Sequence, residues 1–513
     1  MCRKNLLLGL ILLLAAAAGT APAETLLFVD DYHVLYRAGT VRVPHYPVRC
    51  EGNPVIPDTQ PWEAAIAWTS VYRNPETGKY QIWYQAYGGN KTAQPQCVTC
   101  YAESEDGIHF ERPALGLFPY GDIKDTNIVM VGNGGHSLRY GNAVIVDPRD
   151  SDPARRYKMA YFDFARNGAV ETPGLHVAFS PDGIHWSKPE VPMPLLPVAY
   201  GELEQDVPFP AEPNRSWIVP LSMSDALDVF YDEPRGCFSI YGKMWIDGPT
   251  GKTAWKHAMG RTTSVDFLHW SAPELVLAPD DEDAAHVEFH TSPVFYHGGC
   301  YFSLAQILNR AEKGGVIDIE LMLSRDGLDW KRPFRERFFL PRSDGSGFDS
   351  GSIFTNSTPV ILEDEIRFYY GAYSMGATSA SDGEQLSGVG MASIPRDRFA
   401  GIRPVAVSNQ ATLKEPILNT GQVTLKPLDL SQCDSLHLNA DAREGEVRVE
   451  LLSASGYRIA GFTEDDAIPI TGDSLRHTVA WRTRTLADLE KGQYLVRIHL
   501  KNTEVFALDL ISR

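Results

Sequence analysis

The chain has 513 residues and a formal net charge of −18 at neutral pH, because 65 acidic residues outnumber 47 basic ones. This negative field repels nucleic acid and anionic membrane surfaces, so neither is expected as a partner. The 10 Trp, 22 Tyr and 22 Phe, together with 43 Gly and 35 Pro, favour an all-β protein with many turns.

The first expected element is an export signal at residues 1–23. Arg3 and Lys4 precede an apolar stretch at 6–18, and Ala-Pro-Ala at 21–23 matches an A-x-A cleavage site. We expect a Sec-type signal peptide cleaved after Ala23, which would place the mature protein in the periplasm or outside the cell. No later segment has the length of an apolar membrane span, so membrane insertion is not expected.

A ten-residue motif then occurs four times. Its copies are SEDGIHFERP (104–113), SPDGIHWSKP (180–189), SVDFLHWSAP (264–273) and SRDGLDWKRP (324–333). Each copy follows an apolar strand, a turn, an aromatic-rich strand, a loop and a third strand, and a fifth block at 358–402 ends in a degenerate copy. Repeated four-stranded antiparallel sheets are typical of propeller blades, so residues 24–403 are expected to form a five-bladed β-propeller.

The aspartates of this motif are expected to be structural. Asp106, Asp182 and Asp326 precede glycine, the pattern of a tight turn between two strands. The copy at Asp266 lacks the glycine, and the fifth block has lost most of the motif, which a catalytic residue would not tolerate.

The pattern changes after residue 403. Residues 404–513 contain short strands with a period of two and without the repeated block, which predicts a C-terminal β-sandwich. The expected organisation is therefore a signal peptide at 1–23, a propeller at 24–403 and a sandwich at 404–513.

Candidate site residues stand near the starts of the first strands of the blades, which line the central channel of a propeller. Acidic groups brought together there repel one another and raise each other's pKa, an arrangement better explained by function than by stability. These polar and aromatic candidates are Trp62, Glu63, Arg139, Asn142, Asp225, Asp228, Glu288, His290 and Asp349.

Several carboxyl groups in one cleft suit cleavage of a glycosidic bond. One protonates the leaving oxygen, and another attacks the anomeric carbon or activates water. We assign the catalytic roles to Glu63, Asp225 and Glu288. For each acid the structural alternative is an ion pair or a turn, and for Trp62 it is core packing. The residues assigned to substrate binding are Trp62, Arg139, Asn142, Asp228, His290 and Asp349.

Two patterns raise the question of a metal. In HVEFH, His286, Glu288 and His290 share one face of a strand and would suit zinc, but a sugar-binding histidine beside an acid explains the pattern equally well. CVTC at 97–100 has no second CxxC, which favours structural cysteines. No P-loop, Rossmann glycine pattern or nucleophile elbow is present, so neither a metal nor a cofactor is assigned.

Five segments carry a family resemblance: LLFVDDYHVL, NPVIPDTQPWE, VDPRDSDPARRYKMAYFD, SDALDVFYD and GFTEDDAIPITGDSLRHTVAW. On these segments the chain resembles the five-bladed propeller glycoside hydrolases of families 32, 43 and 68, and more closely the bacterial exported proteins similar to family 32. Family 32 enzymes carry W-M-N-D-P-N-G, R-D-P and E-C-P motifs, where this chain has PWEAA, RYGNA and SDALD. The resemblance thus implies the fold but not fructose specificity.

The function expected from these features is that of an exported glycoside hydrolase acting on an oligo- or polysaccharide. Two alternatives remain. A sialidase-like hydrolase would need an arginine cluster and a tyrosine paired with a glutamate, and a non-catalytic carbohydrate-binding propeller would hold its acids apart.

Overall fold

The computed structural model describes residues 23–88, 97–132, 140–167, 170–190, 194–197, 223–247, 254–312, 314–377, 385–407 and 418–512. In these ranges the regular structure consists of strands and two 3-10 helices, η1 (Pro153–Arg155) and η2 (Leu486–Asp488), which confirms the predicted all-β class. No helix in the same ranges is long and apolar enough to cross a membrane. The chain divides into a central unit, Arg42–Gly401, and a terminal unit, Met1–Val41 with Ile402–Arg513.

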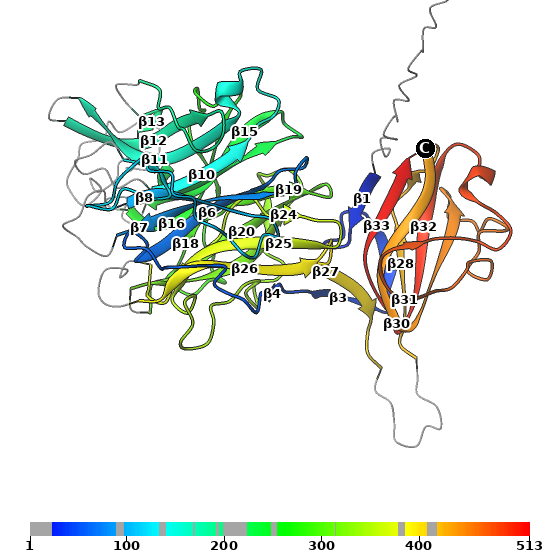
Figure 1. The fold of residues 1–513 in the computed structure, drawn as a ribbon. Coiled ribbons are helices and arrows are strands. Elements are labelled where there is room, and N and C mark those ends of the chain that lie inside the picture. The colour runs from blue at the N-terminus through cyan, green and yellow to red at the C-terminus, as the bar shows by residue number, and fades with distance from the viewer. Residues whose placement is uncertain are drawn as a thin grey trace, which may run out of the picture. The chain divides into compact units, whose positions relative to one another are not determined.

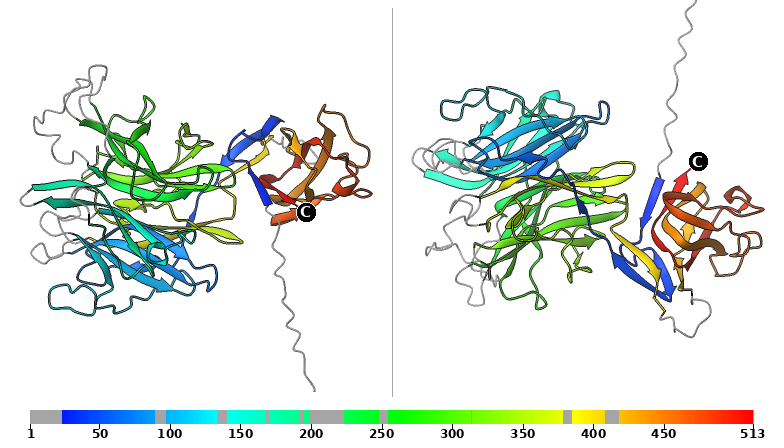
Figure 2. Two further views of the ribbon diagram at one scale, coloured as in Figure 1. Left: turned by 90° about the horizontal axis from the view of Figure 1, so that it is seen from above. Right: turned by 60° about the horizontal axis from the view of Figure 1, so that its bottom comes forward.

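Three sheets of the central unit (Figures 1 and 2) each contain four antiparallel strands in chain order. The first sheet contains β6 (Ala65–Arg73), β7 (Tyr80–Tyr87), β8 (Cys97–Ser104) and β9 (Ile128–Val131). The second contains β10 (Tyr140–Val146), β11 (Tyr157–Asn167), β12 (Val170–Ser180) and β13 (Leu196–Pro197). The third contains β14 (Met223–Asp232), β15 (Cys237–Asp247), β16 (Ala254–Ser264) and β17 (Glu274–Leu277). These are the first three repeated blocks of the sequence.

The fourth and fifth blocks share an eleven-stranded sheet. The fourth contains β18 (Val287–Thr291), β19 (Val294–His297), β20 (Cys300–Asn309), β21 (Val316–Ser324) and β22 (Trp330–Lys331). The fifth contains β23 (Ser352–Phe354), β24 (Val360–Ile361), β25 (Glu365–Tyr373) and β26 (Ser387–Pro395). Two N-terminal strands, β4 (Val48–Arg49) and β5 (Ile56–Pro57), complete it by pairing with β26.

Neighbouring blocks pack on one another in chain order. β6 contacts β10, β10 contacts β14, β16 contacts β18, and β25 and β26 contact β6, so the last block packs on the first. Many of the strands are buried along almost their whole length because both faces of the sheets are covered. The core lies between the blocks, in clusters that contain Trp83 with Met159, Phe162 with Ile240, Tyr241 with Tyr301, and Ile82 with Tyr369.

The repeated motif forms a turn held by its own side chains. In the second block, the Ser180 hydroxyl donates to Asp182 Oδ1 (3.0 Å) and accepts from the Gly183 N–H (2.9 Å), while Asp182 Oδ1 also accepts two backbone N–H bonds. The same bonds recur around Ser104, Ser264 and Ser324. Gly183 has a φ of 79°, which favours glycine, and Phe267 takes the same conformation with a φ of 68°.

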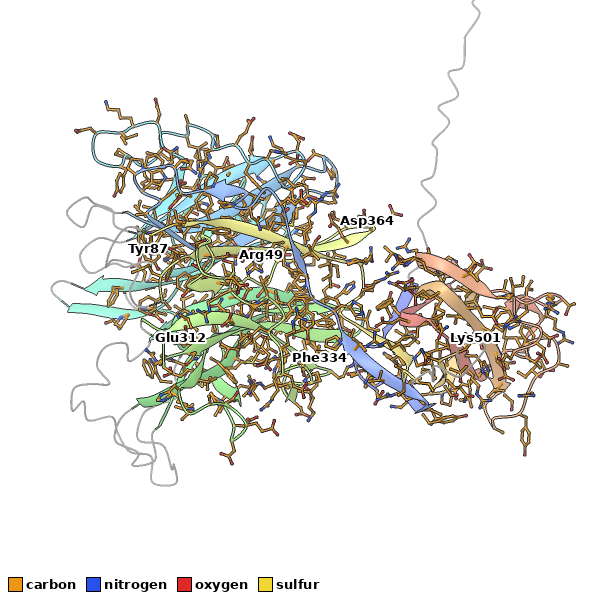
Figure 3. The ribbon with its side chains drawn as sticks, turned by 90° about the horizontal axis from the view of Figure 1, so that it is seen from below. Arg49, Tyr87, Glu312, Phe334, Asp364 and Lys501 are labelled. Atoms are coloured by element: carbon orange, nitrogen blue, oxygen red, sulfur yellow. The ribbon has the colours of Figure 1, made fainter. Side chains whose placement is uncertain are left out.

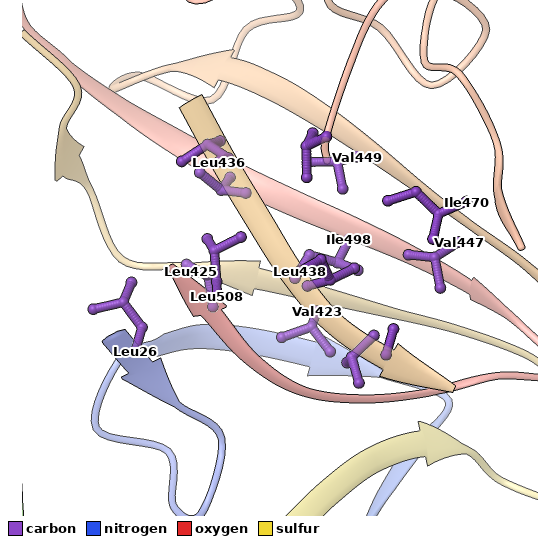
Figure 4. Packing of buried hydrophobic residues seen from close by; sticks show 14 of the residues in the cluster. Leu26, Val423, Leu425, Leu436, Leu438, Val447, Val449, Ile470, Ile498 and Leu508 are labelled. Atoms are coloured by element: carbon purple, nitrogen blue, oxygen red, sulfur yellow. The ribbon is translucent and has the colours of Figure 1, made fainter. Parts of the chain in front are cut away.

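The terminal unit is built around a ten-stranded sheet whose core is shown in Figure 4. Its strands include β1 (Ala23–Leu27), β2 (Val34–Ala38), β3 (Thr40–Pro44), β27 (Ala400–Pro404), β28 (Thr420–Leu425), β29 (Leu428–Asp429), β30 (Cys433–Ser453), β31 (Ile470–Thr478), β32 (Gln493–Lys501) and β33 (Glu504–Ser512). β1 pairs with β33, and β2 pairs with β28. The predicted boundary at 403/404 lies close to Ile402, but residues 24–41 lie with the terminal unit because of these two pairings.

Candidate active site

A cluster of charged and titratable side chains gathers where the third sheet meets the first strand of the fourth block. We call it the histidine–acid cluster; its members are Asp225, Lys243, His257, Glu288, His290 and Arg310. Asp225 lies on β14 at an irregularity between Met223 and Leu227, where the register with β15 shifts. A bulge of this kind redirects a side chain from an otherwise regular strand.

Asp225 forms an ion pair with Lys243 on β15. Burial raises the pKa of Asp225, but Lys243, His290 and His257 outweigh it and hold the pKa below its usual value. Its side chain is 13% exposed. Asp225 is therefore an ionised carboxylate at neutral pH that keeps some contact with solvent.

Glu288 on β18 is the second carboxylate of the cluster. Its Oε2 lies 2.5 Å from His257 Nδ1 and accepts the His257 backbone N–H, and its Oε1 accepts from Arg310 Nε at 2.6 Å. Burial raises the pKa of Glu288, but His257 and Arg310 outweigh it and lower the pKa to about 2. Both oxygens are thus bonded, and the group is ionised.

His257 on β16 is buried beside Trp245, its neighbour across the strand pair, with ring centroids 3.8 Å apart. Burial, with Lys243 close by, lowers the pKa of His257 to about 4, so the imidazole is neutral at pH 7. Because Nδ1 faces an ionised carboxylate, it carries the ring proton and Nε2 has the lone pair. His257 Nε2 is buried and has no hydrogen-bond partner in the part of the chain that the structure describes.

His290 follows Glu288 by two residues on β18. Its Nδ1 lies 3.0 Å from Gln306 Oε1, and its ring stacks on Trp68 with the ring centroids 5.9 Å apart. Burial and the nearby Lys243 lower the pKa of His290 to about 3. Lys243 thus acts on Asp225, His257 and His290, while His257 hydrogen-bonds Glu288 and acts electrostatically on Asp225. The structure brings three of the predicted residues together: Asp225, Glu288 and His290.

Glu63 and Trp62 lie in a different network, inside the first block. Both Glu63 oxygens bond to Arg112, at 2.9 Å each, and Oε1 accepts from the Tyr84 hydroxyl at 2.6 Å. Glu63 and Tyr84 are fully buried, and burial together with Glu63 raises the Tyr84 pKa well above its usual value. Trp62 is also buried and donates to Asn127 Oδ1. This pairing favours a structural role for Glu63 and core packing for Trp62.

Asp349 belongs to a third group, in the fifth block. Its Oδ2 accepts from Arg49 Nε at 2.7 Å and from the Tyr370 hydroxyl at 3.0 Å. Arg49, on β4, is labelled in Figure 3. The Asp349 carboxylate is thus paired with Arg49 and Tyr370, and it does not belong to the histidine–acid cluster.

Asp228 and Asn142 are buried polar residues on first strands. Burial raises the pKa of Asp228 to about 7, although bonds from Ser357 and the Val229 N–H favour its charged form. Both polar atoms of the Asn142 amide are buried and have no partner within the described ranges. Arg139 lies outside the residues that the structure describes.

The metal alternatives gain no support from the described part of the chain. His286 is exposed. The Glu288 carboxylate is hydrogen-bonded to His257, which belongs to another sheet. Cys97 and Cys100 are both buried on β8. Across the described ranges no three His, Cys, Asp or Glu side chains are arranged to hold a metal ion.

Sequence reasoning missed Lys243, Trp245, His257 and Arg310. A signal was available for one of them, because Lys243 in SIYGKMW interrupts a largely apolar strand. A charged or titratable side chain that a strand buries needs a partner, and an acid is the usual one. The partner of His257, 31 residues away, could be found only from the fold.

Comparisons with known proteins return solved structures only. No family model matches the chain, and no curated protein matches it. A structure described as a glycoside hydrolase is 12% identical with a TM-score of 0.44, over 73% of this chain and 95% of that one. An N-acetylgalactosamine deacetylase from F. plautii is 15% identical with a TM-score of 0.45, over 71% and 97%. A Bombyx mori β-fructofuranosidase is 10% identical with a TM-score of 0.39, over 92% and 94%. Glycoside hydrolases, the class that the sequence resembles, are thus among the similar solved structures.

Proposed function

We propose that the chain is an exported glycoside hydrolase that acts on an oligo- or polysaccharide at the histidine–acid cluster. In this proposal the five blocks are the blades of a five-bladed β-propeller, and the terminal unit is a β-sandwich. One observation supports the proposal most: Asp225 and Glu288, carboxylates from different sheets, both act on the same histidine, His257, and Asp225 is also paired with Lys243.

The chemistry assigns different roles to the two acids. An ionised carboxylate can attack an anomeric carbon or activate water, and it stabilises the positive charge that develops on the sugar ring. Asp225 suits attack or water activation, because it is ionised and partly exposed. Glu288 has both oxygens bonded, so it acts on the substrate through its negative charge and through His257.

The sialidase-like alternative gains little from the Tyr84–Glu63 pair and its neighbour Arg112. A tyrosine nucleophile has to reach the substrate, whereas Tyr84 is fully buried and its raised pKa keeps the phenol neutral. The non-catalytic alternative, a propeller that binds carbohydrate without cleaving it, is an outcome of the test below.

The test is a hydrolysis screen of the purified mature protein on a panel of oligo- and polysaccharides, with identification of the products. On a responsive substrate, Asp225→Asn and Glu288→Gln should each lower turnover at least about 100-fold. Asp232→Asn is the matched control, because Asp232 is a buried acid on the same strand β14 that bonds Tyr301 and Arg235. Full activity in both cluster variants would refute the assignment, and binding of a glycan without cleavage would favour the binding protein.

Export has a separate test. The expected signal peptide ends at Ala23, so N-terminal sequencing of protein secreted by a bacterial host should give Glu24 as the first residue. Retention of an uncleaved chain in the cytoplasm would contradict this part of the proposal.

A further inference from the structure

Two ring nitrogens beside the acids of the cluster have no hydrogen-bond partner in the described part of the chain. His257 Nε2 and Trp245 Nε1 are both buried, and neither has a hydrogen-bond partner among the residues that the structure describes. A buried polar atom without a partner destabilises a fold, and such atoms are uncommon in native proteins. Two of them on adjacent rings therefore indicate a ligand.

The two groups are complementary. Trp245 and His257 pair across β15 and β16, and their ring centroids lie 3.8 Å apart. The indole Nε1 can only donate a hydrogen bond, whereas His257 Nε2 accepts one as long as Nδ1 carries the proton. A hydroxyl group performs both functions, since its oxygen accepts and its hydrogen donates.

The histidine is fixed in the accepting state by its surroundings. Glu288 Oε2 accepts both the Nδ1–H and the backbone N–H of His257, and Arg310 anchors the other carboxylate oxygen. Lys243 disfavours a second proton on the ring. His257 remains an acceptor down to about pH 4, the pKa to which burial and Lys243 lower it.

We infer that His257 Nε2 and Trp245 Nε1 form a hydroxyl-binding subsite that holds one hydroxyl of a polyhydroxylated ligand next to Asp225 and Lys243. The identification of that ligand as a sugar rests on the proposed function, whereas the subsite rests on the two nitrogens. His257 binds the hydroxyl, and Glu288 is the positioning residue that holds the imidazole in its accepting tautomer.

Binding of simple sugars tests the subsite without catalysis. The probes are D-glucose, D-mannose, D-galactose, D-fructose, D-xylose and L-arabinose, measured by isothermal titration with the full mature chain. His257→Phe keeps a ring beside Trp245 but removes the acceptor, and Trp245→Phe removes the donor. Each should weaken binding of the best probe about tenfold, the loss of one hydrogen bond.

His297→Phe is the matched control. His297 is a half-buried histidine of the central unit, with Nε2 2.5 Å from Asp397 Oδ1, and it lies outside the histidine–acid cluster. This variant should lose stability but keep its affinity for the probe. Equal loss of affinity in all three variants would show that repacking alone weakens binding, and would overturn the inference.

A second measurement covers the case in which a variant fails to fold. In ¹⁵N NMR spectra of the wild-type chain labelled at histidine, His257 should show a protonated Nδ1 and an unprotonated Nε2 at pH 7. Addition of the bound sugar should shift the Nε2 signal. A proton on Nε2 in the free protein, or no sugar that binds, would overturn the inference.

The outcomes separate the two proposals. Sugar binding that depends on His257, in a protein that cleaves no glycan, supports the subsite and refutes the hydrolase. Hydrolysis that depends on Asp225, with binding unaffected by His257→Phe and Trp245→Phe, supports the hydrolase and refutes the subsite.

Discussion

Trp83 on β7 donates its indole N–H to the carbonyl of Gly183 at 2.7 Å, and so joins the first sheet to the turn of the second. A Cβ on Gly183 would lie 2.5 Å from the Trp83 ring, so glycine is needed for space as well as for its φ. The same bond joins two other pairs of blocks at 2.7 Å: Tyr369 to Gly107 and Tyr241 to Gly327.

The junction between the second and third sheets lacks this bond and is packed by different residues. In the first and third sheets, Trp83 and Tyr241 each lie three residues after the strand residue that pairs with the motif serine. In the second sheet the same position is Ala160. The following turn has Phe267 in place of glycine, and Phe267 packs in the same core cluster as Ala160. At this junction the large side chain therefore comes from the turn instead of from the strand.

This exchange predicts a non-additive pair of substitutions. Phe267→Gly should destabilise the central unit by about 3 kcal/mol, because the cavity outweighs the relief of a positive φ. Ala160→Tyr alone should overpack the core and lower stability by about 1–3 kcal/mol. In the double variant the tyrosine can fill the cavity and bond the new glycine, so urea unfolding should recover at least about 1 kcal/mol of the summed losses. Strict additivity would contradict the exchange.

The serine of the motif should contribute measurably to each turn. Ser180→Ala leaves the Gly183 N–H without its acceptor and should lower the free energy of unfolding by about 1–2 kcal/mol in urea titrations. Ser303→Ala is the control, since Ser303 is buried but its hydroxyl has no partner within the described ranges. Equal effects at the two positions would show that the turn bonds are not needed for stability.

The Glu63–Arg112 pair predicts a loss of stability rather than of chemistry. Glu63→Gln leaves Arg112 without its buried counter-charge and should destabilise the central unit by about 3 kcal/mol. Asp280→Asn, which breaks the exposed pair with Arg335, should change stability by less than about 1 kcal/mol. Denaturant midpoints measured with turnover separate the two roles of Glu63: loss of turnover in a fully stable Glu63→Gln protein would restore the catalytic assignment.

The buried histidines His257 and His290 should lose their contribution to stability in mild acid, before Glu288 takes up a proton. The pKa of His257 is lowered to about 4 from an ordinary 6.5, so below pH 6.5 the unfolded chain takes up a proton that the folded chain refuses. Its contribution to the free energy of unfolding should fall by about 2 kcal/mol between pH 6.5 and 5. Glu288 also loses its contribution to stability as the pH falls, but in a lower pH range, from about 4.5 towards 2.

Thermal denaturation at a series of pH values checks this prediction. His257→Phe should flatten the dependence on pH between 6.5 and 5, and His290→Phe should do the same, because the pKa of His290 is lowered to about 3. An unchanged slope in both variants would mean that neither histidine is kept neutral by the fold.

Local features of the fold could be predicted from the sequence. The turn aspartates and the glycines after them act within a few residues, and the structure confirms the bonds of Asp106, Asp182 and Asp326 to nearby backbone N–H groups. The repeated blocks could be predicted for the same reason, since each of the first three sheets is built from four consecutive strands.

Whether each acid is paired with a cation could not be predicted, because the partner is distant in sequence. Arg112 is 49 residues from Glu63, and Arg49 is 300 residues from Asp349. The sequence shows that both kinds of charge are present, but only the packing of neighbouring blocks decides which acids are neutralised. Asp225 differs from Glu63 because its cation, Lys243, also acts on His257 and His290. Glu288 differs because its carboxylate bonds His257 as well as Arg310.

The pairing of β1 with β33 has a consequence for how the protein is made. β1 is synthesised before the central unit and β33 after it, so β1 has no pairing partner until β33 has been made. The central unit is completed earlier, because β4 and β5 pair with β26, which ends at Pro395. The central unit can therefore finish folding as a nested segment before β33 is available to pair with β1.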